Sequence, residues 1–308
     1  MPYNMKDAKK ARDELTVRQE RSIRKVYNEW AREARDEAKR LTRTVGKIDE
    51  ARAATELYYQ LRTASKQITS EINKEVEKNI SSMGSVVANV NKQWLHQLGF
   101  TEESINRKFN PSKDMAIRSI LTGNLYDNKM PLSDRIWNST ESNLKDINTI
   151  VSKGILTNQS VNEIALQLEK YLNPSKNLGW KTQIIEKDGV KRLYHIRNRK
   201  ADWRAQRLAR TMLQHSYQQT LVAMTKDNPF VTGYIWHAAG NHACELCLDR
   251  DGQFYTAEDL PLDHPNGQCD FEVAIDEQKA MRNLSEFYEN PIYYPDIQRF
   301  TEGLDYED

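Results

Sequence analysis

The sequence predicts a mainly helical α+β protein, in which long N-terminal helices precede a small β-containing C-terminal domain. Three observations support this class. Apolar residues recur at helical spacing through the first third of the chain, β-favouring runs appear only after residue 180, and all three cysteines fall within residues 244–269. At roughly 100–200 residues per domain, 308 residues predict two structural units, or one compact body with a long extension.

Two long amphipathic helices are expected in the first third of the chain. Apolar positions separated by three or four residues share one helix face, with charged residues between them. The first such stripe comprises Ile23, Val26, Trp30, Ala34, Ala38 and Leu41, and the second comprises Leu57, Leu61, Ala64, Ile68, Ile72, Val76 and Ile80. The polar run 81–85 is expected to interrupt the second helix, and Asn110-Pro111-Ser112 to start a shorter one over 112–122.

The middle of the chain predicts a helical pair. An apolar face over 144–151 ends at Gly154, which is expected to be the C-cap glycine of the first helix. Ser160 and Glu163 have the spacing of a capping box and begin a second helix, which Asn173-Pro174 ends. Beyond it, Asp188-Gly189 between two β-favouring runs predicts a hairpin. A helix over about 202–226 and a strand over 231–236 follow.

Composition excludes several classes of protein and reveals an uneven distribution of charge. No apolar run approaches the ~20 residues that cross a bilayer, and the N-terminus lacks the apolar segment of a signal peptide. Three cysteines are too few for a disulfide framework, so we expect a reducing compartment. Residues 176–210 carry 11 Lys and Arg against 3 Asp and Glu, whereas residues 241–308 carry 4 against 17. The basic stretch could contact phosphates and the acidic end basic protein surfaces, although such runs also occur on solvated helix faces.

The three cysteines, together with one histidine, form the candidate functional site of the sequence. Cys244 and Cys247 are separated by two residues, and His264 and Cys269 follow sixteen residues later with four residues between them. Two closely spaced thiolates can bind one metal from a tight turn, and a distant His/Cys pair completes a tetrahedron. This pattern predicts a structural Cys3His zinc site that would substitute for a hydrophobic core. The competing interpretation is three reduced, partly buried thiols and a histidine held in a turn.

Two enzymatic interpretations use the same residues. A zinc deaminase needs His-x-Glu before Pro-Cys-x-x-Cys, and the glutamate and proline are absent here. An HNH-type nuclease would use Asp263 and His264, with the histidine as general base, but no further histidine follows to complete its ligands. A Cys nucleophile paired with His264 is formally possible. The other histidines are expected to be structural, and His242 is the nearest competitor of His264 for a metal.

The late motifs resemble those of a known family. The run Tyr234-Ile235-Trp236-His237, the Cys-x-x-Cys at 244–247, Asp251-Gly252-Gln253-Phe254-Tyr255 and the closing 264–269 segment, His-Pro-Asn-Gly-Gln-Cys, are similar to bacteriophage minor head proteins. These are the head morphogenesis proteins related to the Mu-type head protein F and to the portal-associated minor head protein of tailed siphophages. Ala209-Arg210-Thr211 also resembles the family's preceding helix. The resemblance covers roughly residues 145–275, and Gly267 and Met212 depart from it, where a cysteine and an acidic residue are common.

The resemblance implies a minor capsid protein that acts in head assembly at the portal vertex. We expect an elongated helical region at 1–140, a head-morphogenesis domain with the Cys/His module at 141–275, and an acidic C-terminal tail at 276–308. The expected partners are the portal protein, capsid or scaffold proteins, and non-specifically bound double-stranded DNA, without a membrane. The protein is expected inside the virion head, and in the host cytoplasm during assembly. We expect no enzymatic activity; the alternative is a zinc-dependent, HNH-like DNA-processing enzyme. Expected phosphate contacts are Lys191, Arg192, Arg197, Arg199, Lys200 and Arg204.

Overall fold

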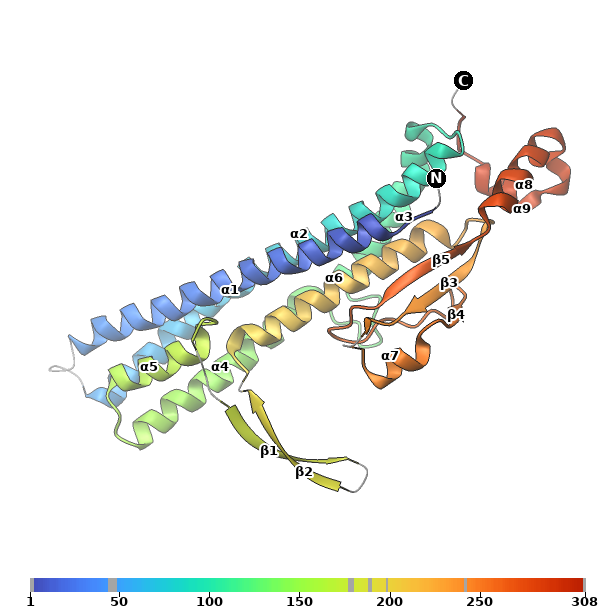
Figure 1. The fold of residues 1–308 in the computed structure, drawn as a ribbon. Helices are drawn as coiled ribbons and strands as arrows, with labels where there is room; N and C mark the ends of the chain where they lie inside the picture. Colours follow the sequence, from blue (N-terminus) through green and yellow to red (C-terminus); the bar gives the residue numbers. More distant parts are fainter. Residues whose placement is uncertain are drawn as a thin grey trace. The chain divides into compact units, whose positions relative to one another are not determined.

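The computed structural model describes residues 3–43, 49–176, 180–187, 190–197, 199–240 and 243–306 (Figure 1). It confirms the mainly helical α+β class, because long helices dominate and a small antiparallel sheet lies near the C-terminus. The helices are α1 (Lys6–Thr42), α2 (Glu50–Gln97), α3 (Glu102–Leu121), α4 (Leu132–Leu156), α5 (Val161–Leu172), α6 (Ala201–Thr225), α7 (Glu245–Arg250), α8 (Glu277–Glu289), η2 (Pro291–Tyr293) and α9 (Pro295–Thr301). The strands are β1 (Trp180–Lys187), β2 (Val190–Arg197), β3 (Val231–His237), β4 (Phe254–Tyr255) and β5 (Asp270–Ile275).

The chain packs into two compact units, and neither is one continuous segment. Unit 1 comprises Met1–Val17, Val76–Leu132 and Ala209–Asp308, and unit 2 comprises Arg18–Glu75 and Ser133–Leu208. Each unit therefore takes chain from both sides of residue 140. The segment predicted as an acidic tail forms α8, η2 and α9 within unit 1.

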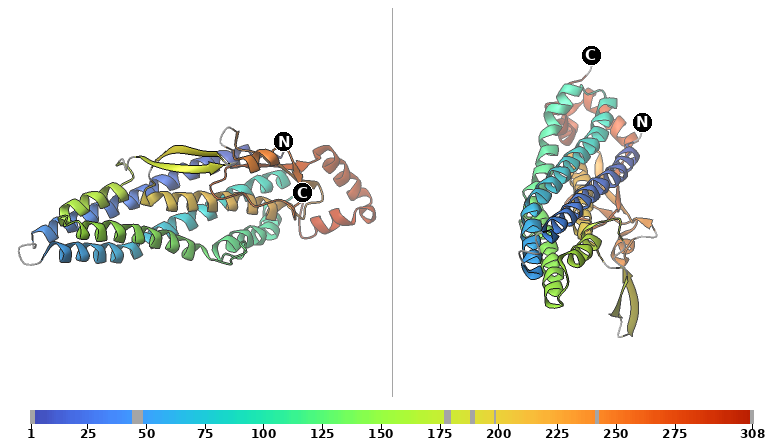
Figure 2. Two further views of the ribbon diagram at one scale, coloured as in Figure 1. Left: turned by 90° about the horizontal axis from the view of Figure 1, so that it is seen from below. Right: turned by 90° about the vertical axis from the view of Figure 1, so that its left-hand side faces the viewer.

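Unit 2 is a helical bundle with one β-hairpin. Figure 2 shows α4 and α5 beside the portions of α1 and α2 that belong to this unit. Ion pairs and hydrogen bonds join these helices: Arg35 of α1 to Glu169 of α5 at 3.4 Å, and the Val161 amide to Glu50 of α2 at 2.7 Å. Strands β1 and β2 pair antiparallel from Trp180 opposite Arg197 onward, which confirms the predicted hairpin. The expected turn, Asp188-Gly189, lies outside the described residues.

Unit 1 contains a three-stranded sheet in the order β4-β3-β5, with antiparallel pairing. Alternation along β3 buries Tyr234 and Trp236, while Phe271 of β5 meets the Trp236 ring edge-on with centroids 4.9 Å apart. Tyr217 of α6 contributes to the same core. Burying these large rings together stabilises the small sheet against the helix.

The N-terminal end of α1 is anchored to the C-terminal part of unit 1 by a buried arginine. Arg12 is only 5% exposed, and its Nη1 donates to Asp270 Oδ1 at 2.8 Å and to the backbone carbonyl of Cys269 at 3.1 Å. Lys9 also pairs with Asp270. A buried guanidinium is stable only when its donors find such acceptors, so this contact fixes β5 to α1.

Two predicted interruptions are wrong. Helix α2 continues through the polar run 81–85, because Met83 is fully buried and Gly84 allows close packing: a Cβ there would lie 2.8 Å from Ile117 Cδ1. Helix α3 likewise contains Pro111 in its interior instead of starting beside it. Proline removes its own amide donor and its ring crowds the carbonyl four residues earlier, at a cost of about 3 kcal/mol. The burial of Phe109 and Ala116 on either side of it offsets that cost.

The predicted helical pair in unit 2 is present, but its glycine has a different role. The capping box is confirmed: the Ser160 hydroxyl accepts from the Glu163 amide and the Glu163 carboxylate accepts from the Ser160 amide. Gly154 is not the C-cap, because α4 continues to Leu156 and Asn158 adopts the left-handed conformation, with φ of 55°. The Gln159 amide then donates to the Gly154 carbonyl at 2.9 Å, as in a Schellman motif. Gly154 is required because a Cβ would overlap Ile164 of α5.

Replacing Gly154 with alanine should therefore destabilise unit 2. Alanine gains ~1 kcal/mol of helix propensity, but overpacking against the fully buried Ile164 costs ~1–3 kcal/mol. We expect a lower midpoint of urea unfolding for Gly154→Ala. Ser152→Ala, at an exposed position of the same helix, is the control and should leave the midpoint unchanged or raise it. Equal behaviour of the two variants would show that the close approach of α5 does not require glycine.

No helix in the described part of the chain combines the length and the apolar character needed to cross a membrane.

Candidate metal centre

The first half of the candidate centre lies on the short helix α7. Cys244 is its N-cap residue, with extended backbone angles, and the Cys247 amide donates to the Cys244 carbonyl at 3.0 Å. One tight turn thus places both sulfurs on the same side, as the two-residue spacing predicts. Cys247 is fully buried, whereas Cys244 is exposed.

The second half lies on the loop that leads into β5. Its turn is closed by the Gly267 amide, which donates to the His264 carbonyl at 2.8 Å, and Asn266 adopts a left-handed φ of 70°. Cys269 is the last residue before β5 and is buried. The loop therefore presents one imidazole and one thiol on a rigid turn.

The two halves meet, and three of the four predicted ligands form one group. The Cys244 Sγ lies 3.3 Å from His264 Nε2, and the ligand atoms of Cys244, Cys247 and His264 all lie within 4.8 Å of one another. Cys247 also belongs to a second group, with Cys269 and Asp263. Among the described residues, no group within that distance contains all four predicted ligands, so Cys269 joins the cluster through Cys247.

The hydrogen bonding of the imidazole suits a metal ligand. His264 Nδ1 lies 3.2 Å from the Pro265 carbonyl, while Nε2 faces the sulfur of Cys244. A ligating histidine commonly donates its second N–H to a carbonyl, which fixes the ring and its tautomer. These side chains could hold a metal ion.

The three thiols differ in pKa because their burial and their neighbours differ. The backbone N–H of Cys247 lowers the pKa of Cys244, and the neighbouring His264 adds to this effect. Burial raises the pKa of both Cys247 and Cys269, and the Asp263 carboxylate raises that of Cys269 further. A bound cation would reverse this for the buried thiols, because metal ligation requires thiolates and offsets their charge.

A polar stripe on α6 holds the loop in place, and the sequence analysis did not identify it. Gln214 donates to the Cys269 carbonyl at 2.6 Å, and His215 Nε2 lies 2.9 Å from the Asp263 carbonyl oxygen. Gln218 donates to the Pro261 carbonyl at 2.7 Å. Spacings of three and four residues put these side chains on one helix face, and all three are buried. The sequence offered no local signal for this stripe, because the partners of these side chains lie 43 to 55 residues further along the chain.

The same face of α6 also joins two separate sequence motifs, Ala209-Arg210-Thr211 and the 264–269 loop. Arg210 donates to Asn266 Oδ1 at 2.7 Å, and the Thr211 hydroxyl accepts from the Asn266 amide at 2.9 Å. The Ala-Arg-Thr helix and the His-Pro-Asn loop are therefore parts of one contact. At Met212, where the resembling family often has an acidic residue, the sulfur lies 3.3 Å from the Tyr126 hydroxyl.

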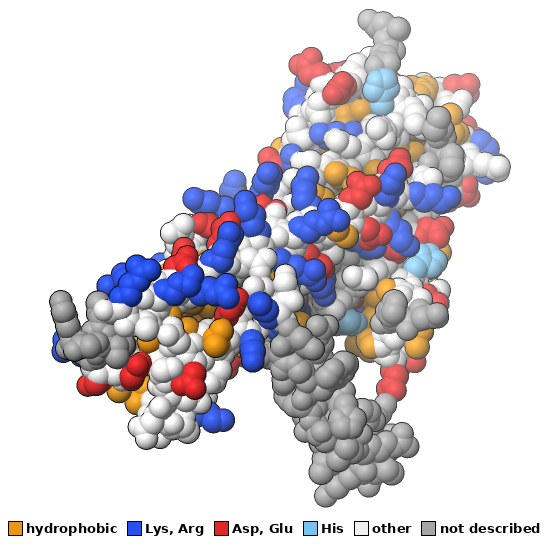
Figure 3. All heavy atoms as spheres, turned by 60° about the vertical axis from the view of Figure 1, so that its left-hand side comes forward, with side chains coloured by type: hydrophobic (Ala, Val, Ile, Leu, Met, Phe, Trp, Pro, Cys, Tyr) orange, Lys and Arg blue, Asp and Glu red, His pale blue; other side chains and the backbone are white. Residues whose placement is uncertain are grey.

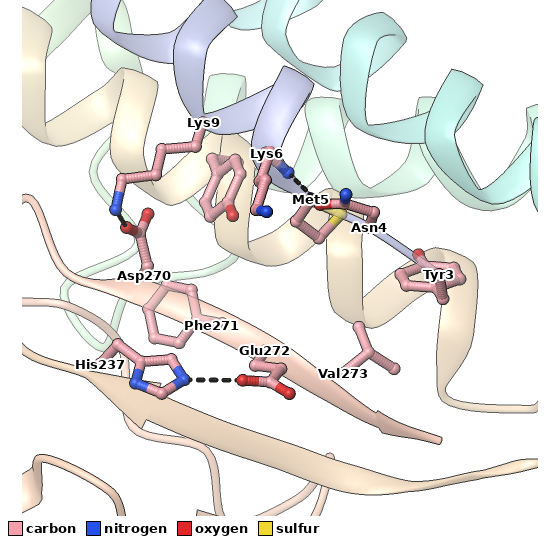
Figure 4. Close-up of a pocket in the computed structure, with 11 residues that line it drawn as sticks. Tyr3, Asn4, Met5, Lys6, Lys9, His237, Asp270, Phe271, Glu272 and Val273 are labelled. Atoms are coloured by element: carbon pink, nitrogen blue, oxygen red, sulfur yellow. Dashed lines mark hydrogen bonds and ion pairs between the residues drawn. The ribbon is translucent and has the colours of Figure 1, made fainter. Parts of the chain in front are cut away.

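The neighbouring His237 has a different partner. His237 Nε2 lies 3.0 Å from Glu272 Oε2, beside a cavity of about 370 Å³ between β5 and residues 3–9 (Figure 4). Lys9 and Asp270 pair on the same cavity wall. His242, the alternative ligand considered from sequence, lies outside the described residues.

The expected phosphate contacts are only partly described. The side chains of Lys191, Arg192 and Arg197 lie outside the described residues. Within unit 2, Arg199 stacks on Trp203 at 3.9 Å, Lys200 donates to the Asn173 carbonyl at 2.6 Å, and Arg204 binds Asp146 at 2.8 Å. On the face drawn in Figure 3, Lys and Arg side chains are interspersed with Asp and Glu.

Comparison of the chain with models of protein families, with curated protein sequences and with solved structures finds no match.

The acidity and burial of the thiols predict an order of reaction in metal-free protein. With a chelator present, Cys244 should be alkylated by iodoacetamide well before Cys247 and Cys269, because only the thiolate reacts and only Cys244 combines exposure with a lowered pKa. As the pH falls, its alkylation should slow at a lower pH than that of a cysteine with an unshifted pKa. Peptide mass spectrometry at timed intervals measures the order. Simultaneous alkylation of all three cysteines would contradict the described burial.

Proposed function

We propose that this chain is a non-catalytic assembly protein of a bacteriophage head, a minor head protein that binds the portal vertex. The carrying observation is the convergence of Cys244 and Cys247 with the loop bearing His264 and Cys269. That loop is also where the sequence motifs of the resembling family meet. Portal, capsid or scaffold proteins are the proposed partners, inside the virion head and in the host cytoplasm during assembly.

Zinc is the proposed metal, in a structural role. Three thiols and one imidazole favour zinc over harder cations such as magnesium or calcium, which prefer oxygen ligands. A site closed by four protein ligands leaves no position for a reacting water. Binding would join α7 to the loop before β5 and so add to the stability that the buried rings of Trp236 and Phe271 already supply.

The hydrogen bonding around Asp263 and His264 favours assembly over the HNH-like alternative. The His264 ring faces Cys244 with one nitrogen and the Pro265 carbonyl with the other. The Asp263 carboxylate accepts backbone N–H groups instead of orienting that imidazole. A general base needs a free nitrogen directed at a substrate proton.

The distribution of charge between the two units supports two kinds of partner. The ranges of unit 2 carry 28 Lys and Arg against 18 Asp and Glu, whereas those of unit 1 carry 17 against 26. A basic unit is suited to non-specific contact with double-stranded DNA, which would weaken steeply with salt. An acidic unit is suited to a basic protein surface.

The zinc proposal predicts about one equivalent of metal in purified protein. His264→Ala and Cys244→Ser should each lower the zinc content and destabilise unit 1, because removal of one ligand opens the coordination shell. The matched control is His237→Ala, since His237 pairs with exposed Glu272 in the same sheet. Elemental analysis and thermal unfolding measure the effect. Metal-free protein with unchanged thermal stability would contradict a structural zinc site.

The assembly proposal predicts co-purification with a portal ring. Co-expression of the chain with portal and capsid proteins of the same phage, followed by affinity capture of the portal, should retain the chain at physiological salt. The purified chain should leave plasmid DNA intact in the presence of magnesium, manganese or zinc. Plasmid cleavage that His264→Ala abolishes, but His237→Ala does not, would establish the nuclease alternative instead.

A further inference from the structure

A buried carboxylate connects the two ligands of the loop. Asp263 is 2% exposed. Its Oδ1 accepts from the His264 amide at 2.8 Å, and its Oδ2 accepts from the Cys269 amide at 3.2 Å. One side chain thus fixes the backbone of both candidate ligands in this half of the centre, five residues apart in sequence.

The loop is shaped around this carboxylate. A Cβ on Gly267 would overlap both oxygens and the carboxyl carbon of Asp263, so the space of a side chain at 267 is filled by the carboxylate. The Asp263 backbone is itself held by α6: its amide donates to Gln218 Oε1 at 3.0 Å and its carbonyl lies 2.9 Å from His215 Nε2. Asp263 is therefore fixed on α6 and in turn fixes the loop.

Within the described part of the chain, no Lys or Arg side chain pairs with Asp263; the charged neighbour that favours its carboxylate is the candidate ligand His264. Its described hydrogen-bond donors are backbone amides and the Gln214 side chain, and the described salt bridges do not include it. Its carboxylate oxygen lies within 4.8 Å of the sulfurs of Cys247 and Cys269. Burial without a counter-charge is costly for a carboxylate, and two adjacent thiolates would raise that cost. A divalent cation at the sulfurs would offset it.

We propose that Asp263 is the positioning residue of the metal centre and is not one of its ligands. It sets the spacing of His264 and Cys269 through their amides, and it supplies negative charge next to the metal. Both oxygens accept hydrogen bonds from the loop backbone, and the three thiols and the imidazole of the proposed site supply the four ligands that a structural zinc needs. This inference rests on the metal centre of the proposed function and adds a residue to it.

Asp263→Asn in the full chain tests the proposal, with Co²⁺ as a spectroscopic substitute for zinc. The asparagine amide nitrogen cannot accept an N–H, so one of the two ligand amides loses its acceptor and the charge is lost. We expect Co²⁺ and Zn²⁺ to bind roughly 10–100-fold more weakly, measured by competition with a chromogenic chelator. The Co²⁺ absorption bands should keep their wavelengths, because the donor atoms are unchanged.

Asp259→Asn is the matched control. Asp259 accepts from the Thr256 hydroxyl in an exposed turn, and the substitution removes the same charge four residues away. Its metal affinity should equal that of the unchanged protein. Gly267→Ala is the second variant, since it retains Asp263 but displaces the carboxylate, and it should also weaken binding. Circular dichroism verifies the helical content of each variant.

Each outcome decides between the possibilities. Unchanged affinity in Asp263→Asn would overturn the proposal while leaving the metal centre intact. A shift of the Co²⁺ bands would make Asp263 a ligand, which also overturns it. Loss of binding in Asp263→Asn together with unchanged binding in Gly267→Ala would contradict the role of carboxylate position. Failure of the unchanged protein to bind either metal would instead overturn the metal centre of the proposed function.

Discussion

The polar face of α6 is the constraint on which the late part of unit 1 depends. Gln214, His215 and Gln218 bind backbone groups of the loop that precedes β5, and Thr211 binds the same loop through Asn266. Without these bonds the loop would leave buried carbonyl and amide groups unsatisfied, at a cost of about 1–3 kcal/mol each. Helix α6 therefore fixes the conformation of this loop, and the loop in turn fixes the positions of His264 and Cys269.

The apolar core of unit 1 and the hydrogen bonds between α6 and the loop contribute differently to the structure. Trp236, Phe271 and Tyr217 bury the inner face of the sheet against α6, which supplies non-directional stability. The hydrogen bonds of α6 and Asp263 fix the orientation of the loop before β5, because each one requires a donor and an acceptor that are aligned with each other. A metal would add a third kind of bond, joining α7 to a loop that the protein itself already holds.

Local patterns in the sequence predicted the elements well and their packing less well. The capping box at Ser160, the hairpin and the strand at 231–236 were identified because each depends on neighbouring residues. Gly154 and the polar run 81–85 were misinterpreted. Gly154 and Gly84 each allow a side chain of another helix, Ile164 and Ile117 respectively, to pack closely, and the local sequence does not show these contacts. The Cys/His cluster was predicted from its spacing, but the α6 stripe was not, because hydrogen bonds between segments some 45–55 residues apart leave no local pattern.

The anchor formed by Arg12 has a consequence for biogenesis. Its acceptor on Cys269 lies 257 residues further along the chain. At ~5–20 residues per second, translation delivers that acceptor roughly 13–50 s after Arg12. During this interval the start of α1 lacks its final partner, so unit 1 closes only after Cys269 and Asp270 have been synthesised. A chain shortened before β5 would leave this guanidinium without its main acceptors, and such a product would be a substrate for cellular quality control.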